Sequence, residues 1–444
     1  MDQITYGRWP KYLAATSPVG HHEVVSSFAQ SPMGRLVARH VEPAIAEALL
    51  DTRVVLVNGA RQAGKSTLVR QLARERGAAW FSLDSAVTLR AATDDPTTFV
   101  RAANPMVIDE IQRAPQLLLA IKEVVDAEYA PGRYLLTGSA RLLGLRTLPD
   151  ALPGRMETIE LWPLSQGEIG GAADGFVNTV FRSGPPAWYD ATEDRDGFIR
   201  RIVRGGFPEA VAREGKRRAK FFESYVADLV NRDVMQVSAI EKGQDMRSLI
   251  TLLAARCGQI VSATNLSSTL GVSKQTVDRY LGILAEVFLI KLIPAWSGGA
   301  TGRATRAPKL AFVDSGIAAA LAGYDEMSLR KITSPLGGLL ESFVTMEIAR
   351  QLTWADQAID LFHYRTRDQV EVDIVLANRR REIVAIEVKS SATVGPGDFS
   401  GIRHLRARLG SDLLAGIVLY LGRQTLSFGD RQVAMPVSAL WELG

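Results

Sequence analysis

Apolar residues recur at helical spacing from about position 35 onward. The first series is Leu36, Val37, Val41, Ile45 and Leu49. Short apolar runs then predict four buried strands, at 54–57, 80–83, 106–108 and 134–136. Because helical patterns separate these strands, we expect a parallel sheet with helices on both faces, in an α/β domain that ends near Leu164.

Helical patterns dominate the next region, 165–240, where Pro185-Pro186 and the turn Gly205-Gly206-Phe207-Pro208 interrupt them. We expect a helical lid or linker there. Three short helices and two strands then follow, at 246–257, 263–270, 274–286, 288–295 and 310–313. That order is typical of a winged helix-turn-helix.

The last part of the chain opens with a helical pattern at 339–352 and continues with strands near 359–364, 370–376 and 383–389. A second α/β or α+β domain fits this pattern. The expected segments are a flexible extension rich in Ser, Pro and His (1–33), an α/β domain (34–164), a helical lid or linker (165–240), a winged-helix domain (241–330) and a C-terminal α/β domain (331–444).

A phosphate-loop pattern of two glycines, a lysine and a hydroxyl follows the first predicted strand and precedes a predicted helix. It reads Gly59-Ala60-Arg61-Gln62-Ala63-Gly64-Lys65-Ser66-Thr67. The glycines allow backbone N–H groups to surround phosphates, and the helix start favours an anion. Lys65 is expected to contact the β- and γ-phosphates of ATP, and Ser66 to bind Mg²⁺ through its hydroxyl.

Two adjacent carboxylates, Asp109 and Glu110, end the apolar strand at 106–108. We expect Asp109 to hold magnesium through water and Glu110 to polarise the attacking water. The alternative is a solvated strand end, which the rarity of buried charges without partners disfavours.

Hydroxyl and arginine side chains follow the next strand. Thr137 and Ser139 are sensor candidates, because a hydroxyl there could reach the γ-phosphate or the water. Arg141 and Arg155 are candidate transition-state cations, within the chain or toward a neighbouring subunit. Each is at least as easily explained as a surface arginine.

Together these elements resemble the AAA+ superfamily, and more narrowly a prokaryotic group of ATPases that ends in domain of unknown function 4143. The motifs are Gly59–Thr67 (Walker A), Val107–Gln112 (Walker B), Leu136–Arg141, Gly205–Pro208 and Glu371–Val375. The resemblance implies ATP hydrolysis but no particular substrate. It also makes an oligomer an expectation, since rings are common in the superfamily. One departure is Ser66-Thr67 in place of two threonines, which keeps the magnesium hydroxyl.

The predicted winged helix carries polar and basic residues near the start of its third helix, where base-reading side chains would lie. Ser273 can cap this helix, and the other residues are Lys274, Gln275, Thr276 and Arg279, with Arg303 and Arg306 in the predicted wing loop. Contact with nucleic acid is one hypothesis. The alternative is a module that packs or binds a protein partner, because the fold alone does not decide.

Acidic residues and a lysine lie on successive strands of the C-terminal region. Glu371-Val372-Asp373 and Glu387-Val388-Lys389 follow a helix with Glu341 and Glu347, an arrangement that resembles the PD-(D/E)XK nuclease family. The resemblance implies a divalent metal on Asp373 and Glu387, with Lys389 orienting water and Glu341 in support. The alternative is a salt bridge at a sheet edge without cleavage.

Composition adds few constraints. The 444 residues, 47% of them hydrophobic and 23% charged, fit a globular protein of several domains. Net charge of +4 permits contact with polyanions without requiring it. The longest apolar runs, such as 413–421, are shorter than the roughly 18 residues of a membrane span, and no secretory signal is recognisable. Cys257 lies in an apolar setting that predicts a buried thiol, and the histidines lack zinc-ligand spacing.

The leading hypothesis is a cytoplasmic, magnesium-dependent ATPase whose nucleotide cycle repositions the winged-helix and nuclease-like modules. One alternative is a nucleotide-gated DNA-binding regulator or adaptor with little turnover. Another is an ATP-controlled nuclease that uses the C-terminal acidic residues.

Overall fold

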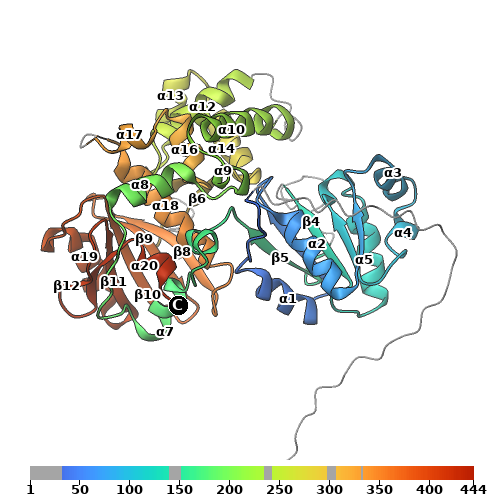
Figure 1. Cartoon of the computed structure of the whole chain (residues 1–444), viewed down its shortest axis with the longest axis horizontal. Helices are drawn as coiled ribbons and strands as arrows, with labels where there is room; N and C mark the ends of the chain where they lie inside the picture. Colours follow the sequence, from blue (N-terminus) through green and yellow to red (C-terminus); the bar gives the residue numbers. More distant parts are fainter. Residues whose placement is uncertain (1–32, 140–151, 235–242, 298–306, 332–333) are drawn as a thin grey trace, which may run out of the picture.

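A computed structural model describes residues 33–139, 152–234, 243–297, 307–331 and 334–444. Within them lie an N-terminal α/β region, a helical middle region and a C-terminal region built on a mixed sheet (Figure 1). Almost all of the predicted flexible extension, 1–33, lies outside the described residues. No helix of the described ranges is long and apolar enough to cross a membrane.

The N-terminal region is a five-stranded parallel sheet in the order β2-β3-β4-β1-β5. Its elements are α1 Glu42–Asp51, β1 Val54–Gly59, α2 Lys65–Arg76, β2 Ala79–Ser82, α3 Ala86–Asp94, α4 Pro96–Phe99, β3 Met106–Asp109, η1 Ile111–Arg113, α5 Leu117–Ala127, β4 Tyr134–Gly138 and β5 Met156–Leu161. The four strands predicted from apolar runs are confirmed.

Helices cover both faces of this sheet, as the alternation of strands and helices predicts. Val54 and Leu56 of β1 pack in one apolar cluster, which α5 joins. Val55 and Val57 pack in the cluster on the opposite face, which α1 and α2 join. Successive strand residues therefore feed opposite faces, and every residue of β1 is buried.

Two details differ from the sequence expectation. The first helix begins at Glu42 and not near position 35, because Pro43 occupies its first turn, where proline fits best. The prediction that Leu36 belongs to a buried helix face was wrong, since that side chain is 62% exposed. The edge strand β5 was not expected, because Glu157 and Glu160 interrupt its apolar pattern.

The middle region is mostly helical, with one two-stranded antiparallel sheet. Its elements are α6 Gln166–Gly170, α7 Phe176–Ser183, α8 Arg195–Arg204, α9 Pro208–Val211, α10 Gly215–Asp228, η3 Leu229–Val234, α12 Gly243–Ala255, α13 Ala263–Leu270, α14 Lys274–Glu286, β6 Ile290–Ile293, β7 Lys309–Phe312, α16 Ser315–Leu321 and α17 Glu326–Leu329. The predicted order of three helices and two strands is confirmed. Cys257 is buried as predicted, and burial raises the pKa of its thiol to about 11.

The C-terminal region is a six-stranded mixed sheet in the order β12-β13-β11-β10-β9-β8. Its elements are α18 Leu336–Gln351, β8 Ile359–Arg365, β9 Glu371–Asn378, β10 Ile383–Lys389, η4 Pro396–Phe399, α19 Ser400–Leu409, η5 Gly410–Asp412, β11 Leu413–Tyr420, β12 Leu426–Ser427, β13 Gln432–Pro436 and α20 Ala439–Glu442. The predicted α/β class of this region is confirmed.

One large apolar cluster joins the middle and C-terminal regions through α18. This helix is buried almost all round, as expected for a helix packed between two layers. The phosphate-loop residues Ala60 and Ala63 and the nearby Trp162 belong to the same cluster. The loop is therefore packed against the rest of the molecule and not only against its own sheet.

Candidate functional site

The phosphate-loop segment turns sharply between β1 and α2. Gly64 has φ +99° and Gln62 has φ +58°, so the loop passes through left-handed conformations that suit glycine at position 64. At Gly59 a Cβ atom would lie 2.0 Å from the Leu161 carbonyl oxygen, which leaves room only for glycine. Because α2 begins at Lys65 with Gly64 as its N-cap, the first N–H groups of the helix lie beside the loop, where they favour an anion.

Lys65 opens α2 and folds over the loop. Its Nζ donates hydrogen bonds to the carbonyl oxygens of Gly59 at 3.0 Å and Ala60 at 2.8 Å. The ammonium thus lies where the loop's own backbone surrounds it, and a bound phosphate would exchange for these carbonyl partners.

Ser66, Asp109 and Thr137 come together at the carboxyl end of the parallel strands. The hydroxyls of Ser66 and Thr137 both donate to Asp109 Oδ1, at 2.9 and 2.5 Å. Burial raises the pKa of Asp109, and these two hydrogen bonds oppose the rise. A hydroxyl and a carboxylate 2.9 Å apart are hard oxygen ligands of the kind that Mg²⁺ prefers, so these residues fit the ion.

Glu110 has left-handed backbone, φ +62°, directly after β3. Its N–H donates to Thr137 Oγ1 at 3.0 Å, and its Oε2 accepts from Ser139 Oγ at 3.2 Å and from Gln112 Nε2. Gln112 Nε2 also donates to Ser139 Oγ at 2.7 Å. The two sensor candidates therefore touch the carboxylates directly, and neither carboxylate is a freely solvated strand end.

A cavity of about 480 Å³ opens beside the phosphate loop, a volume within the range of small-ligand sites. Its polar side includes Lys65, Ser66 and Glu110, and its apolar rim combines residues from three parts of the chain. The rim residues are Met33, Leu36, Val37, Leu164 and Pro208. Sequence reasoning missed Leu36 and Val37, because their apolar spacing was interpreted as a helix face, whereas the Gly205–Pro208 turn had been singled out.

A second cavity of about 240 Å³ lies on another side of Glu110. Arg61 and Gln62 of the loop line it, together with Tyr225, Asp228, Leu229 and Arg232 of the middle region. Tyr225 donates to the Arg61 carbonyl oxygen at 3.4 Å. The region next to Glu110 thus contains a middle-region arginine, Arg232, that no sequence motif marked.

The structure does not bring Arg155 to the nucleotide loop of its own chain. Its carbonyl oxygen accepts from Val54 N, so it lies at the amino end of β1, whereas Gly59 lies at the carboxyl end. Its side chain pairs with Asp126 of α5. A role within the chain is contradicted by this placement, and a role toward a neighbouring subunit stays a prediction. Arg141 lies outside the described residues.

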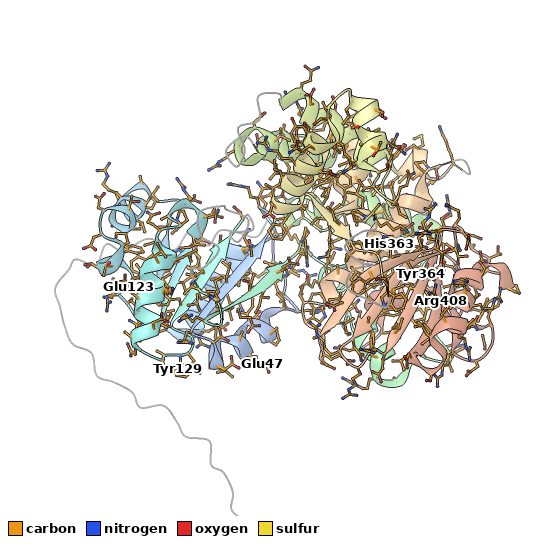
Figure 2. The ribbon with its side chains drawn as sticks, turned by 180° about the vertical axis from the view of Figure 1, so that it is seen from behind. Glu47, Glu123, Tyr129, His363, Tyr364 and Arg408 are labelled. Atoms are coloured by element: carbon orange, nitrogen blue, oxygen red, sulfur yellow. The ribbon has the colours of Figure 1, made fainter. Side chains whose placement is uncertain are left out.

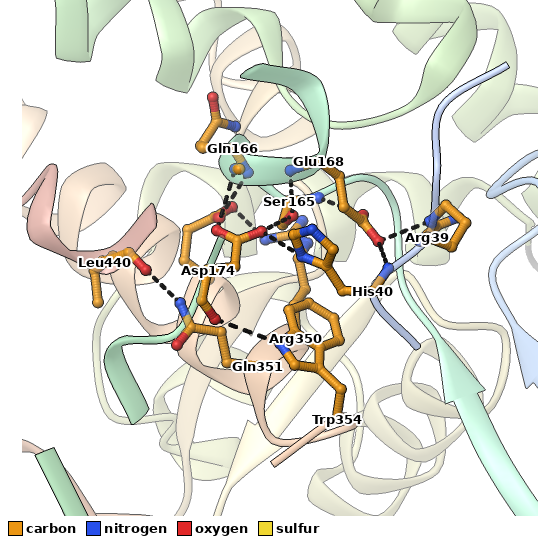
Figure 3. A network of polar contacts seen from close by, with 12 residues as sticks. Arg39, His40, Ser165, Gln166, Glu168, Asp174, Arg350, Gln351, Trp354 and Leu440 are labelled. Atoms are coloured by element: carbon orange, nitrogen blue, oxygen red, sulfur yellow. Dashed lines mark hydrogen bonds and ion pairs between the residues drawn. The ribbon is translucent and has the colours of Figure 1, made fainter. Parts of the chain in front are cut away.

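Arg39 ties the phosphate loop to the middle region in a buried polar network (Figure 3). Its guanidinium donates to the carbonyl oxygens of Ala63 at 2.8 Å and Trp162 at 2.7 Å, and pairs with Glu168 at 3.0 Å. Burial of Glu168 opposes its ionisation, but the Arg39 charge and backbone N–H donors outweigh burial and lower its pKa.

The network continues to α18 of the C-terminal region. Glu347 accepts from Gln166 N at 2.9 Å and pairs with Arg350 at 2.8 Å. Arg350 also donates to the carbonyl oxygens of Pro163 at 2.9 Å and Val313 at 3.1 Å. Hydrogen bonds thus run from the carbonyl of Ala63 through the 163–168 segment to a helix of the C-terminal region.

The predicted nuclease-like residues Glu341, Asp373, Glu387 and Lys389 line one open cavity of about 730 Å³. Asp373 Oδ2 accepts from Val388 N at 2.9 Å, and Lys389 Nζ lies 3.4 Å from Glu387 Oε2. Burial and the Asp373 charge raise the pKa of Glu387. Among the described residues, no group of three or more His, Cys, Asp or Glu side chains is arranged to hold a metal.

The third helix of the predicted winged helix, α14, begins as expected. Ser273 Oγ caps it by accepting from Thr276 N at 3.1 Å. Lys274, Gln275 and Arg279 are exposed, and Lys274 pairs with Asp278 at 2.6 Å. Arg303 and Arg306 lie outside the part of the chain that the structure describes.

Comparison with known proteins finds three matching domain models. Residues 51–170 match an AAA domain, residues 195–328 a domain of unknown function (DUF8612), and residues 336–440 another domain of unknown function (DUF4143). Over 428 residues the chain is 27% identical to uncharacterized proteins of Mycobacterium tuberculosis and Mycobacterium bovis, covering 96% of this chain and 89% of each relative. The Walker-type ATPase of Pyrococcus abyssi is similar at 12% identity and a TM-score of 0.37, covering 65% of this chain and 96% of that one.

Proposed function

Because this chain joins an AAA domain to a domain of unknown function 4143, we propose that it is a magnesium-dependent ATPase whose nucleotide cycle repositions its middle and C-terminal regions. The observation that carries the proposal is the pair of carboxylates at the phosphate loop. Asp109 accepts hydrogen bonds from the hydroxyls of Ser66 and Thr137, and Glu110 accepts one from the hydroxyl of Ser139, which directly follows β4.

Each residue of the site has a distinct role in this proposal. The loop N–H groups and Lys65 bind the phosphates, and Ser66 and Asp109 hold Mg²⁺, Asp109 through water. The ion neutralises phosphate charge when it is bound. Glu110 accepts a hydrogen bond from the attacking water, whose oxygen forms a bond to the γ-phosphorus as the bond to ADP breaks. Thr137 and Ser139 keep the carboxylates in place for that step.

The coupling to the other regions rests on the packing around the loop. Arg39 and the 163–168 segment connect Ala63 to Glu347 of α18, and Tyr225 contacts Arg61. A shift of the loop between nucleotide states would change these contacts. We propose that this is how the cycle reaches the C-terminal sheet.

Nucleotide binding and metal dependence test the proposal together. ATP affinity and turnover are measured for the wild type, Lys65→Ala and Ser66→Ala, with magnesium and with a chelator. Lys65→Ala is expected to weaken ATP binding, and Ser66→Ala to lose turnover with magnesium. Unchanged affinity in the first variant together with unchanged turnover in the second would reject the site.

A nucleic-acid partner is a second candidate, favoured by the exposed side chains of Lys274, Gln275 and Arg279 at the start of α14. In this hypothesis the protein is a nucleotide-gated DNA-binding regulator or adaptor. Duplex binding is measured against salt concentration for the wild type and a Lys274→Ala, Arg279→Ala variant. The wild type is expected to bind, with a salt slope steeper by about two phosphate contacts than the variant's. Identical slopes would favour a protein partner for this face.

An oligomer is a further part of the proposal, because Arg155 can reach a nucleotide only in a neighbouring subunit. Turnover per subunit should then rise with protein concentration, and Arg155→Ala should abolish that rise. Turnover independent of concentration, and unchanged in Arg155→Ala, would remove this role.

A further inference from the structure

Lys309 extends from the middle region to carboxylates that line the acidic cavity of the C-terminal region. It is the first residue of β7, and its side chain is only 5% exposed. Its Nζ lies 2.9 Å from Asp373 Oδ1 and 3.0 Å from Glu371 Oε1, and it also contacts Glu341 Oε1. One ammonium therefore contacts three carboxylates, two from β9 and one from α18.

The backbone of Lys309 belongs to the middle region, although its side chain does not. The residues on either side of it are bonded to the segment between α12 and α13: Leu310 N donates to Gln259 O at 3.1 Å, and Pro308 O accepts from Val261 N at 2.9 Å. Lys309 also pairs across the β6–β7 hairpin with Ile293. A displacement of this hairpin relative to β9 would carry the ammonium with it.

The hairpin rests against β8 at His363, which Figure 2 shows on the C-terminal sheet. The backbone N–H of His363 donates to Pro294 O at 3.0 Å, and the His363 carbonyl accepts from Trp296 N at 2.6 Å. The ring Nε2 of His363 lies 3.1 Å from Ala307 O. The segment after β6 and the segment before β7 thus both contact His363. These contacts fix the position of the hairpin, and therefore of Lys309, relative to the C-terminal sheet.

Lys309 is the main counter-ion of the three carboxylates that it contacts. Five carboxylates line the cavity: Glu341, Asp368, Glu371, Asp373 and Glu387. Lys389 forms an ion pair with Glu387, and Arg365 pairs with Glu371 at 3.3 Å. Buried carboxylates require a partner charge. Glu341 and Asp373 have no ion-pair partner other than Lys309 among the described residues.

An ammonium and a divalent cation cannot share this position. Divalent cations lie about 2.0–2.6 Å from their oxygen ligands. A cation bound by these carboxylates would therefore have to occupy the position between them that Lys309 Nζ fills. We propose that Lys309 is a built-in cation that keeps divalent metals away from Glu341, Glu371 and Asp373. Among the described residues these side chains are not arranged to hold a metal, so they take up a divalent cation only when the β6–β7 hairpin withdraws and they close around the ion.

The test replaces the ammonium with an uncharged side chain of similar length and supplies Mn²⁺ without nucleotide. Full-length wild type, Lys309→Met and the control Lys389→Met are compared by thermal unfolding and by titration with Mn²⁺. Lys389→Met removes the lysine that lines the cavity and pairs with Glu387. All three carry Asp109→Asn, so that the phosphate-loop site does not contribute.

Lys309→Met is expected to unfold at a lower temperature, to regain stability as Mn²⁺ is added, and to bind the ion roughly tenfold or more tightly than the wild type. Adding Asp373→Asn should abolish that gain, and Lys389→Met should resemble the wild type. Should Lys309→Met not fold, Lys309→Gln, which removes the charge but keeps a hydrogen-bond donor for the carboxylates, carries the same expectation for Mn²⁺.

Two results would overturn the inference. If the wild type bound Mn²⁺ as tightly as Lys309→Met, at a site that depends on Asp373, Lys309 would not exclude divalent cations from these carboxylates. A folded Lys309→Met that gains no Mn²⁺ binding would show that the carboxylates are not a latent metal site. ATP turnover is measured separately in chains that retain Asp109, so failure here leaves the ATPase proposal standing.

Discussion

The hydroxyl of Ser66 donates a hydrogen bond of 2.9 Å to Asp109 Oδ1, and the two residues lie 43 positions apart in the chain. This bond joins the start of α2 to the end of β3. Thr137 of β4 donates to the same oxygen atom. One helix and two neighbouring strands of the parallel sheet thus meet at one carboxylate.

Thr137 is expected to matter more for turnover than for folding. Thr137→Val keeps the side-chain shape but removes the donor to Asp109 and the acceptor for Glu110 N. Loss of these hydrogen bonds should cost about 1–3 kcal/mol of unfolding free energy and lower turnover about tenfold or more. Thr137→Ser, which keeps the hydroxyl, should recover most of both in denaturant unfolding and ATPase assays. Equal turnover in the two variants would contradict the role.

The motifs that predicted this site are local in sequence, which is why sequence reasoning reached them. Asp109 and Glu110 are adjacent and end an apolar strand, and the phosphate loop is one continuous segment. The resemblance to ATPases with a C-terminal domain of unknown function 4143 rests on such local motifs, and the matching domain models confirm it. Because the carboxyl ends of parallel strands meet at one edge of the sheet, the loop and the two carboxylates could also be expected to lie close together.

Contacts between distant segments were not predictable in this way. Lys309 and Asp373 are 64 positions apart, and their contact depends on how a middle-region hairpin packs on another sheet. Arg155 was a candidate transition-state cation, but the parallel pairing of β1 and β5 puts it at the other end of the sheet from the phosphate loop. In both cases tertiary packing, and not local pattern, fixes the partner.

Arg39 should be important for stability and for the nucleotide site at once. Arg39→Ala leaves Glu168 buried without its ion-pair partner, which typically costs about 3–5 kcal/mol, and frees the Ala63 carbonyl. Unfolding by denaturant should report the loss, and ATP affinity should fall with it. Arg35→Ala is the matched control, because Arg35 is an exposed residue with one weak bond of 3.4 Å to Ile169 O. Similar losses in both variants would contradict this account.

His363 should make the protein less stable in mild acid. Burial, together with the Lys309 and Arg365 charges, lowers the pKa of His363 to about 4, although the Ala307 carbonyl and Glu371 oppose this. The unfolded chain binds the proton near pH 6.5, so this contribution is full above pH 6.5 and is lost as pH falls toward 4. The loss amounts to at most about 3 kcal/mol.

Denaturant unfolding of the wild type and of His363→Gln checks this expectation. It is measured from about pH 7.5 to about pH 4.5, a range that includes the ordinary histidine pKa. The wild type should lose stability over that range more steeply than His363→Gln. Parallel pH profiles would show that His363 titrates alike in the folded and unfolded chains.

The central claim is that Glu110 activates water for ATP hydrolysis, and phosphate release by Glu110→Gln tests it most directly. ATP affinity is measured on the same preparations, with magnesium present. The account predicts turnover lower by about 10²–10⁴-fold, with ATP bound about as tightly as in the wild type. Turnover equal to that of the wild type, at equal ATP affinity, would contradict the account.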